Sequence, residues 1–445
     1  MHIKFSLTRN QTVINILLVV NIFVWYLVAF NLVVMDQTGI NLLLIVAANS
    51  VAIAVSALIA SLVFRNFEKD AFFFKVWIFV GVIVSLIPLL LKTADFSSML
   101  LISIVFGTYF GFGMPKTLGN YSSSVGNGKR ARISGITFLI ISLLTATLGV
   151  LILNNVLLTC IILAAIRLIG LGSYRFLGKK EESTKEDDLE KTAIFPLRKS
   201  FILYFIPWLI FCLVNYLTIP VITNFFKSDG NFISIIPIIE NIVIAISAVI
   251  GGVLADRLGR KRLIMVGFVM LGLGFASLGL SANYPPIVQI IAGYIYTISD
   301  GVAWGIFYVM FLLTLWGDLA KYRRAEVLYA IGALPFIFGN FFHLLFQAPL
   351  GNIDPTQVFS FASIFLFLAV LPLLYAPETL SDKIIMNQDL KNYVNKALEK
   401  AKTKNGKNQK NSIKLKPREI EEAKEENPVL SPENEEAMKL AEKYY

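Results

Sequence analysis

The sequence predicts an all-α membrane protein with twelve transmembrane helices, arranged as two six-helix halves that repeat one another. Three observations lead to this fold class: the composition, the spacing of long apolar segments, and polar residues that recur at one constant offset. Of the 445 residues, 56% are hydrophobic and only 16% are charged. A soluble protein of this length could not bury so much apolar surface, so lipid is the expected solvent.

Long apolar segments follow one another along most of the chain. A bilayer core of about 30 Å requires roughly 20 helical residues, because an α-helix rises about 1.5 Å per residue. Such segments lie at 13–35, 40–64, 75–92, 97–117, 133–153, 156–176, 200–224, 232–254, 263–281, 286–316, 327–349 and 356–376. The first is too long for a signal-peptide core and has no convincing cleavage site, so we expect it to remain as a span. Only the turn Asn154-Asn155 separates the fifth span from the sixth.

Basic residues are concentrated in alternate loops between these segments. The richer set of loops holds Lys4, Arg9, Arg65, Lys69, Lys75, Lys129, Arg130, Arg132, Arg175, Lys179, Lys180, Arg257, Arg260, Lys261, Arg262, Lys321, Arg323 and Arg324. The other set offers little beyond Lys92 and Lys227. The positive-inside rule therefore predicts a multi-pass protein of the cell membrane with both termini in the cytoplasm. The same loops account for the net charge of +10, so no nucleic-acid partner is expected.

Charge and hydropathy divide the chain into four parts. Residues 1–177 and 200–380 are the two six-helix halves, and residues 178–199 form a polar cytoplasmic loop of mixed charge between them. Residues 381–445 form a charged cytoplasmic tail. Its pattern is compatible with two alternatives: a short helix on the membrane surface, or a solvated, partly disordered segment. Because the twelve spans complete the bundle, we expect that deleting the tail after about residue 385 leaves transport intact.

The two halves repeat one another at an offset of 192 residues without gaps. Asn49 falls on Asn241, Arg65 on Arg257, Lys69 on Lys261, Gly113 on Gly305 and Lys129 on Lys321. Apolar helices align easily, but polar matches at one constant offset indicate a true internal repeat. Parallel six-span halves are typical of one large class of transporters, which hold their substrate near the bilayer midplane where the halves meet.

One polar loop interrupts this apolar sequence, the stretch "GGVLADRLGRKR" from Gly251 to Arg262. Its pattern Gly252-x-x-x-Asp256-Arg257-x-Gly259-Arg260-Lys261, between spans 8 and 9, resembles the cytoplasmic signature of the major facilitator superfamily. Two weaker echoes are "GDLAKYRRAEV" after span 10 and "PETL" after span 12. The resemblance covers roughly residues 10–380 and implies a secondary transporter.

Two departures from the family pattern bear on function. The first-half copy of the signature, "FRNFEKD", has Phe64 where an aspartate belongs. The regions where the sugar-porter branch usually shows Gln-Gln and Pro-Glu-Ser-Pro-Arg read "FCLVNYLTIP" and "GSYRFLGKKE". The branch is therefore not assignable from these residues, and a sugar substrate is not supported by them.

The signature loop also has a physical interpretation as a conformational gate. Gly259 allows a tight turn between antiparallel helices, and Gly251 and Gly252 allow another helix to approach closely. Asp256 ends span 8, where its carboxylate suits the positive end of a helix; the resemblance implies that this helix is span 5, in the other half. Such a contact would form when the cytoplasmic side closes. The gate set is Gly252, Asp256, Arg257, Gly259, Arg260 and Lys261; the alternative is a loop that only sets topology.

Four ionisable residues fall inside predicted spans: Arg167, Glu240, Asp300 and His343. A charge at midplane costs about 2.5–3.5 kcal/mol, so such residues usually face a cavity or a partner. Trp304 and Tyr308 share a helical face with Asp300, and we assign all six residues to a candidate substrate or proton site. The alternatives are a structural pair of the two acids, with Arg167 or His343 as partner, and an Arg167 that extends to the cytoplasmic face.

These observations predict a secondary active transporter that moves a small solute by alternating access. Proton-coupled uptake, with Asp300 or Glu240 carrying the proton, is the first hypothesis. A proton-linked exporter of apolar or cationic compounds and a non-transporting membrane sensor that signals through its tail are the alternatives. The sequence shows no metal cluster, no phosphate-binding loop and no nucleophile–base pair, so we expect neither an enzyme nor a cofactor. The expected partners are a small molecule, protons and lipid, around a monomer.

Overall fold

The computed structural model describes residues 2–63, 70–90, 95–152, 155–177, 199–227, 230–320, 325–350 and 353–380. The chain divides into one unit that extends to Ile385 and a second from Met386 to Tyr445. The tail, residues 178–198 of the central loop and the first-half copy of the signature at 64–69 lie outside the described residues. Within the ranges given, the chain consists of helices and the turns between them.

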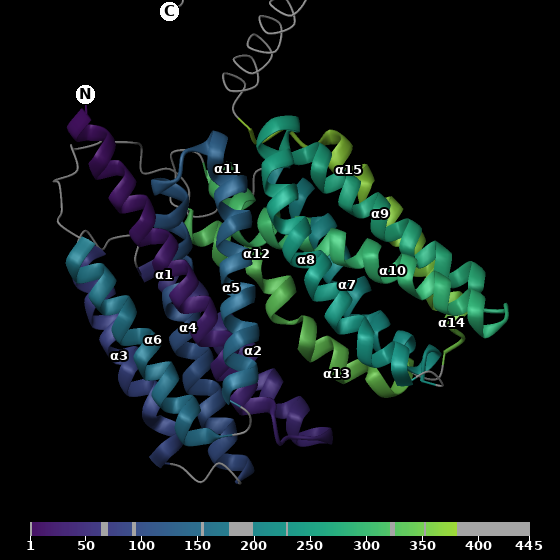
Figure 1. Cartoon of the computed structure of the whole chain (residues 1–445), viewed down its shortest axis with the longest axis horizontal. Helices are drawn as coiled ribbons and strands as arrows, with labels where there is room; N and C mark the ends of the chain where they lie inside the picture. Colours follow the sequence, from purple (N-terminus) through teal and green to yellow (C-terminus); the bar gives the residue numbers. More distant parts are fainter. Residues whose placement is uncertain are drawn as a thin grey trace, which may run out of the picture. The chain divides into compact units, whose positions relative to one another are not determined.

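The first half of the chain contributes six long helices. They are α1 (His2–Val34), α2 (Gly39–Val63), α3 (Asp70–Leu90), α4 (Phe96–Ser124), α5 (Arg130–Ile152) and α6 (Val156–Leu177), with the short turn η2 (Asn127–Lys129) before α5 (Figure 1). Each overlaps one of the apolar segments predicted from the sequence, with ends that differ by a few residues or more. Helix α5 ends at Ile152 and α6 begins at Val156, which agrees with the predicted boundary between the fifth and sixth spans.

The second half contains six further helical spans, three of them built from more than one segment. The single helices are α7 (Lys199–Phe225), α8 (Gly230–Leu258) and α9 (Arg260–Ser281). The segmented spans are α10 (Pro286–Phe307) with the π-helical η3 (Tyr308–Thr314) and α11 (Leu315–Ala320), α12 (Glu326–Ile337) with α13 (Gly339–Leu350), and α14 (Pro355–Leu368) with α15 (Val370–Tyr375).

The helices confirm the predicted fold class. Eleven of those described are long and apolar enough to cross a membrane, and a shorter apolar helix at Val156–Gly172 occupies the place of the sixth span. The 192-residue offset carries Gly39–Val63 onto residues 231–255 of α8, and Phe96–Ser124 onto residues 288–316 of α10, η3 and the start of α11. The repeat found in the sequence is therefore a repeat of helices.

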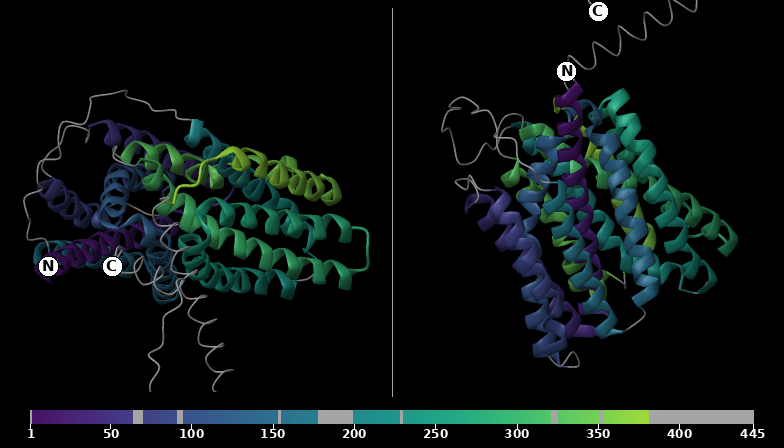
Figure 2. Two further views of the ribbon diagram at one scale, coloured as in Figure 1. Left: turned by 90° about the horizontal axis from the view of Figure 1, so that it is seen from above. Right: turned by 60° about the vertical axis from the view of Figure 1, so that its left-hand side comes forward.

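The two halves contact each other mainly through α5 with α8 and through α2 with α12 and α13. Figure 2 shows α12 and α13, in green, beside the purple α2, and the hydroxyl of Ser50 donates a 2.9 Å hydrogen bond to the carbonyl oxygen of Ile337. We name the two ends of the bundle after residues there: the Gly259 end holds the signature loop, and the Gly39 end holds the turn between α1 and α2.

Burial along α5 and α8 shows where the halves are most tightly packed. In α5, Ala131, Ser134 and Thr137, all near the Gly259 end, are buried, whereas beyond Thr137 only Ile141 is buried among the described side chains. The described part of α8 follows the same pattern, because its buried residues after Phe232 begin at Ile244 and continue toward the Gly259 end. The halves are therefore closed against each other at the Gly259 end and separate toward the Gly39 end.

Candidate functional site

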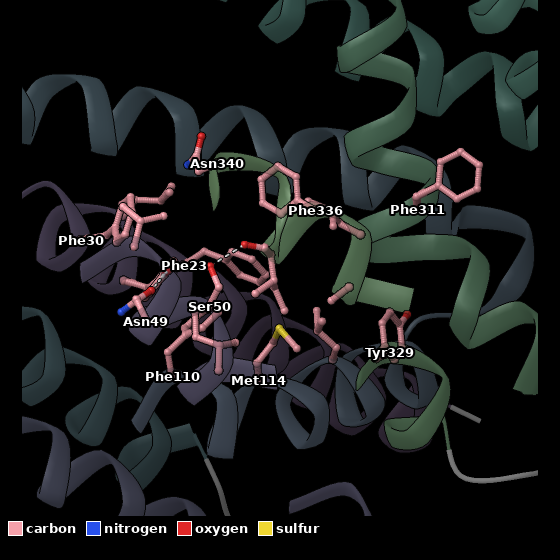
Figure 3. A pocket seen from close by; sticks show the side chains of 18 of the residues that line it. Phe23, Phe30, Asn49, Ser50, Phe110, Met114, Phe311, Tyr329, Phe336 and Asn340 are labelled. Carbon is pink, nitrogen blue, oxygen red and sulfur yellow. Dashed lines mark hydrogen bonds between the residues drawn. The ribbon is translucent and has the colours of Figure 1, made fainter. Parts of the chain in front are cut away.

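A cavity of about 100 Å³ lies between the two halves (Figure 3). Helices α1, α2 and α4 line it from the first half, and α7, η3, α11, α12 and α13 line it from the second. Nine aromatic side chains form much of its wall: Phe23, Tyr26, Phe30, Phe110, Tyr216, Phe311, Trp316, Tyr329 and Phe336. Asn49, Ser50 and Asn340 add polar groups, and none of the described residues that line the cavity is Asp, Glu, Lys, Arg or His.

The signature loop closes the Gly259 end below this cavity. The Asp256 carboxylate accepts hydrogen bonds from the backbone N–H groups of Ala131 at 3.3 Å and Arg132 at 2.8 Å, in the first turn of α5. Four orphan N–H groups and the positive end of the helix dipole make this a favourable position for a carboxylate. The contact between Asp256 and span 5 that the resemblance implied is therefore present, and it joins the two halves.

Two glycines of the loop have the roles expected of them. Gly259 adopts a φ of 97°, a backbone conformation that other residues rarely tolerate, and this allows α9 to start immediately after α8. Gly252 lies directly against the backbone of Ala131, so that a side chain at this position would collide with the Ala131 carbonyl. The lack of a side chain at Gly252 is what allows α5 and α8 to approach each other here.

A second carboxylate, Asp318 in α11, lies at the centre of the closed end. Its Oδ2 is 2.8 Å from Nε of Arg260, and its Oδ1 pairs with Arg130 of the first half and accepts a 2.8 Å hydrogen bond from Asn127. Arg260 also lies 3.4 Å from Asp256, so the two acids share one arginine. Because the side chains of Asp318 and Arg260 are fully buried, this ion-pair cluster has little contact with water.

The end of span 12 adds a third acid to the closed end. Glu378, of the "PETL" stretch, accepts hydrogen bonds from the backbone N–H groups of Arg260 at 2.9 Å and Lys261 at 3.2 Å, at the start of α9. Lys261 donates in turn to the carbonyl of Leu374 at 2.8 Å. Arg257, by contrast, is exposed. Its side chain suits the topogenic role that the positive-inside rule gives such residues.

A further ion pair joins the halves closer to the cavity. Nζ of Lys116 in α4 lies 3.4 Å from Oε1 of Glu326 in α12, and both side chains are at least nine-tenths buried. Lys116 lies between Met114 and Leu118, which both line the cavity. This pair therefore lies between the cavity and the Asp318 cluster along α4, as a first layer of the closed end.

The two acids predicted for proton transfer lie together in the second half. Asp300 of α10 is 3% exposed, accepts a 2.7 Å hydrogen bond from the side chain of Asn215, and lies near Glu240 and Tyr296. The structure therefore brings the two predicted acids close together inside the membrane-spanning part of the chain.

The residues between this acid pair and the cavity belong to α7. Asn215 contacts Asp300, and its neighbour Tyr216 lines the cavity. The ring of His343 in α13 lies near the backbone of Tyr216, rather than beside either acid. His343 thus lies beside the cavity wall, and the expectation that it partners Asp300 or Glu240 is not met in the structure.

The predicted aromatic residues of span 10 lie on the far side of Tyr216 and at the contact between halves. Trp304 stacks on Tyr308 with ring centroids 4.7 Å apart, and its ring edge meets Tyr216 at 6.0 Å. Tyr308 also stacks on Phe138 of α5 at 4.8 Å. Neither Trp304 nor Tyr308 is among the residues that line the cavity, so they support its wall rather than form it.

Arg167 lies apart from both acids, inside the first half. It is fully buried, and its guanidinium carbon is 4.8 Å from the ring centroid of Trp25 and 4.9 Å from those of Trp77 and Tyr109. Nη1 donates a 2.7 Å hydrogen bond to Asn21. The expectations that Arg167 pairs with the acids or extends to the cytoplasmic face are therefore wrong, because aromatic faces and an amide hold the cation within the core.

Sequence reasoning missed several residues of the closed end: Asp318, Glu378, Arg130, Asn127, Lys116 and Glu326. Asp318 and Glu378 belong to the two weaker echoes of the family pattern, which were the available signal for them. Glu326 also stands in the first of these stretches, whereas Lys116 carries no such signal. Their partners lie 210 residues away in the sequence, and neither helix shows which charge will face it.

Comparisons with known proteins agree with this architecture. The family model described as "Sugar (and other) transporter" matches residues 197–429, just over half of the chain. No curated protein matches the chain significantly. Among solved structures, the chain is similar to the major facilitator superfamily proton:xylose symporter XylE bound to 6-bromo-6-deoxy-D-glucose. The TM-score is 0.56 at 14% sequence identity, over 84% of this chain and 96% of the symporter, so this likeness shows the fold alone.

The family match resolves the branch that the motifs left open, while its wide description, "and other", leaves the substrate unnamed. On this match and this fold, the chain belongs to the sugar (and other) transporter family, a family of secondary transporters within the major facilitator superfamily.

Proposed function

We propose that the protein takes up a small solute through the cell membrane by alternating access, and that protons drive the uptake. The observation that carries the proposal is a cavity between two repeated halves whose Gly259 end is closed by buried ion pairs. With both termini in the cytoplasm, the Gly259 end is the cytoplasmic side, and the structure corresponds to a state closed toward the cytoplasm.

The closed end consists of contacts that can break and re-form. Three contacts join residues of different halves: Asp256 with the first turn of α5, the Asp318 cluster, and the Lys116–Glu326 pair. Rocking of one half against the other would separate them and expose the charges to water, where they are well solvated. The small difference between buried pairing and solvation allows both states to be populated.

Proton coupling rests on Asp300 and Glu240. In a low-dielectric surrounding a carboxyl group is costly in its charged form, so neutralising the pair lowers the cost of the occluded state. A substrate in the cavity contacts Tyr216, and the neighbouring Asn215 is hydrogen-bonded to Asp300. A shift of α7 therefore links occupation of the cavity to the hydrogen bonds of the acid pair.

The test is transport by purified protein in proteoliposomes with an imposed pH gradient, using a panel of labelled sugars, amino acids and aromatic alcohols. Asp300→Asn should abolish accumulation driven by the pH gradient while leaving downhill exchange partly intact. Glu240→Gln should affect the pH dependence less and substrate binding more. Asp36→Asn, in the turn before α2, serves as the matched control and should behave as the unaltered protein.

Two outcomes would contradict this proposal. If Asp300→Asn still accumulates substrate with unaltered pH dependence, the acid pair is structural and the coupling is carried elsewhere. If no compound in the panel undergoes counterflow in protein shown to be folded and inserted, this result would favour the alternative that the protein is a non-transporting sensor. Accumulation only in the direction out of the cell would favour a proton-linked exporter.

A further inference from the structure

We infer that the cavity accepts a small neutral molecule built around one flat apolar ring with few hydrogen-bonding groups, and that it discriminates against charged solutes and polyhydroxylated sugars. This inference rests on the proposed function, because it names the substrate class of the same cavity. It follows from three properties of the wall: its charge, its unused hydrogen-bonding groups and its size.

The wall offers no formal charge to a ligand. In the part of the wall that the structure describes, no residue is Asp, Glu, Lys, Arg or His, and the nearby Lys116 is already paired with Glu326. A charged solute would lose its hydration without gaining a counter-ion, which is strongly unfavourable in an apolar site. Aromatic faces attract cations to some degree, so a cation is the charged competitor that the test has to include.

Most polar groups in the wall are already used by the protein. The side-chain amide of Asn49 accepts a 2.7 Å hydrogen bond from Tyr26 and donates one of 2.8 Å to the carbonyl of Ser103. Ser50 donates to Ile337, and the hydroxyl of Tyr329 donates to Leu313 at 2.8 Å. These groups therefore contribute little further hydrogen bonding to a solute.

Two polar groups of the wall make no hydrogen bond to the described part of the chain: the Tyr216 hydroxyl and the Asn340 amide. They suit a ligand with one or two polar groups at its edge. A sugar carries hydroxyl groups around its whole ring, and each one left without a partner would weaken binding about fivefold or more. The wall is thus poorly matched to a sugar, although aromatic rings could cover one of its faces.

The size and shape of the cavity favour a single flat ring. Its volume of about 100 Å³ is comparable to that of engineered apolar cavities of roughly 150 Å³, which hold a benzene molecule. Tyr26 stacks on Phe110 with centroids 4.0 Å apart and a 19° angle between the rings, which presents flat aromatic surface to the cavity. Phe336 stands on the opposite side, from α12 (Figure 3). An aromatic or other planar ring packs well between such surfaces.

The experiment measures binding by isothermal titration calorimetry to the full chain in lipid nanodiscs, with empty nanodiscs as the blank for partition into lipid. Four probes isolate charge and hydroxylation: 4-hydroxybenzyl alcohol, 4-hydroxybenzylammonium, 4-hydroxybenzoate and D-xylose. We expect the neutral alcohol to bind at least tenfold more tightly than each of the other three. Equal or tighter binding of a charged probe or of D-xylose, or no binding of the alcohol, overturns the inference.

A variant that changes only charge sharpens this test. Asn340→Asp adds a negative charge to the wall with almost no change of shape, and it should improve binding of 4-hydroxybenzylammonium relative to the alcohol by about tenfold or more. Gln347→Glu adds the same charge on α13 at an exposed position outside the cavity, and it should leave the preference unchanged. If both variants change the preference equally, the probes bind elsewhere and the inference fails.

The outcome is separable from that of the proposed function. Selective binding of the neutral ring without any transport driven by a pH gradient would retain the substrate class and contradict proton coupling. Accumulation of D-xylose driven by a pH gradient, together with weak binding of the alcohol, would retain the proposed function and overturn the substrate class.

Discussion

Replacing Asp318 with asparagine tests whether the buried ion pairs hold the Gly259 end closed. The substitution keeps the size of the side chain and removes the charge that Arg130 and Arg260 share. Both guanidinium groups would then be buried with less counter-charge, and breaking a buried pair in this way costs about 3–5 kcal/mol. In the open state water solvates the arginines, so the cost falls on the closed state.

The expected result follows from this asymmetry. About 3 kcal/mol corresponds to a change of population on the order of 100-fold toward the state open at the Gly259 end. A cysteine in place of Ser122, which is 4% exposed and packs against Gly317 in the other half, reports the opening by its rate of reaction with a maleimide. The reporter chain carries alanine instead of the two native cysteines, which are buried. We expect Asp318→Asn to accelerate labelling at least tenfold.

Controls and a refuting outcome complete this test. Asp354→Asn removes an acid at the Gly39 end but keeps an acceptor for the N–H group of Thr356, so its labelling rate should equal that of the unaltered protein. Adding Arg130→Gln to Asp318→Asn should partly restore slow labelling, because one uncompensated charge is removed. An unchanged labelling rate in folded Asp318→Asn would show that the cluster contributes nothing to closure.

Three further predictions concern thermal unfolding in nanodiscs. Lys116→Met should lower Tm because it leaves the buried Glu326 carboxylate without its cation, and adding Glu326→Gln should recover most of the loss; equal Tm values for the single and double variants would contradict this. Gly252→Val should destabilise the closed protein by about 1–3 kcal/mol, because the valine side chain would collide with the α5 backbone. Leu258→Val, at an exposed site in the same helix, should have little effect. Arg167→Met should leave Tm unchanged or raise it, because an apolar chain replaces a buried charge, while Asn21→Leu should lower it; a large loss for Arg167→Met would show that the cation is needed for folding.

The sequence predicted best those features that depend only on residues close together in the chain. The length and apolar character of each segment predicted the helices, because in lipid every backbone N–H and C=O must be bonded within the segment. Gly259 was recognisable because a turn with positive φ favours glycine. The position of Asp256 at the end of span 8 also predicted a partner at a helix N-terminus, and the family pattern identified that helix as span 5.

The candidate site was less predictable because its residues come together from distant segments. Asp300 and Glu240 were both identified as ionisable residues inside predicted spans, but their closeness to each other and the hydrogen bond from Asn215 to Asp300 depend on the rotation of three helices. Arg167 was placed near them on sequence grounds, yet it lies in another half of the molecule. Helical periodicity shows which residues share a face, but it does not show which helix that face will meet.

The sequence by itself determined that this protein lies in lipid, where its helical spans fall, that its halves repeat, and which loop joins α8 to α9. Hydropathy and backbone geometry act over a few residues, so they can be read without knowledge of the fold. Tertiary packing alone decided that Lys116 meets Glu326, that Asp318 lies between two arginines, and that the cavity wall is aromatic and without formal charge. Lys116 and Glu326 are 210 residues apart and Arg130 and Asp318 are 188 apart, so only the docking of the two halves brings these pairs within a few ångströms.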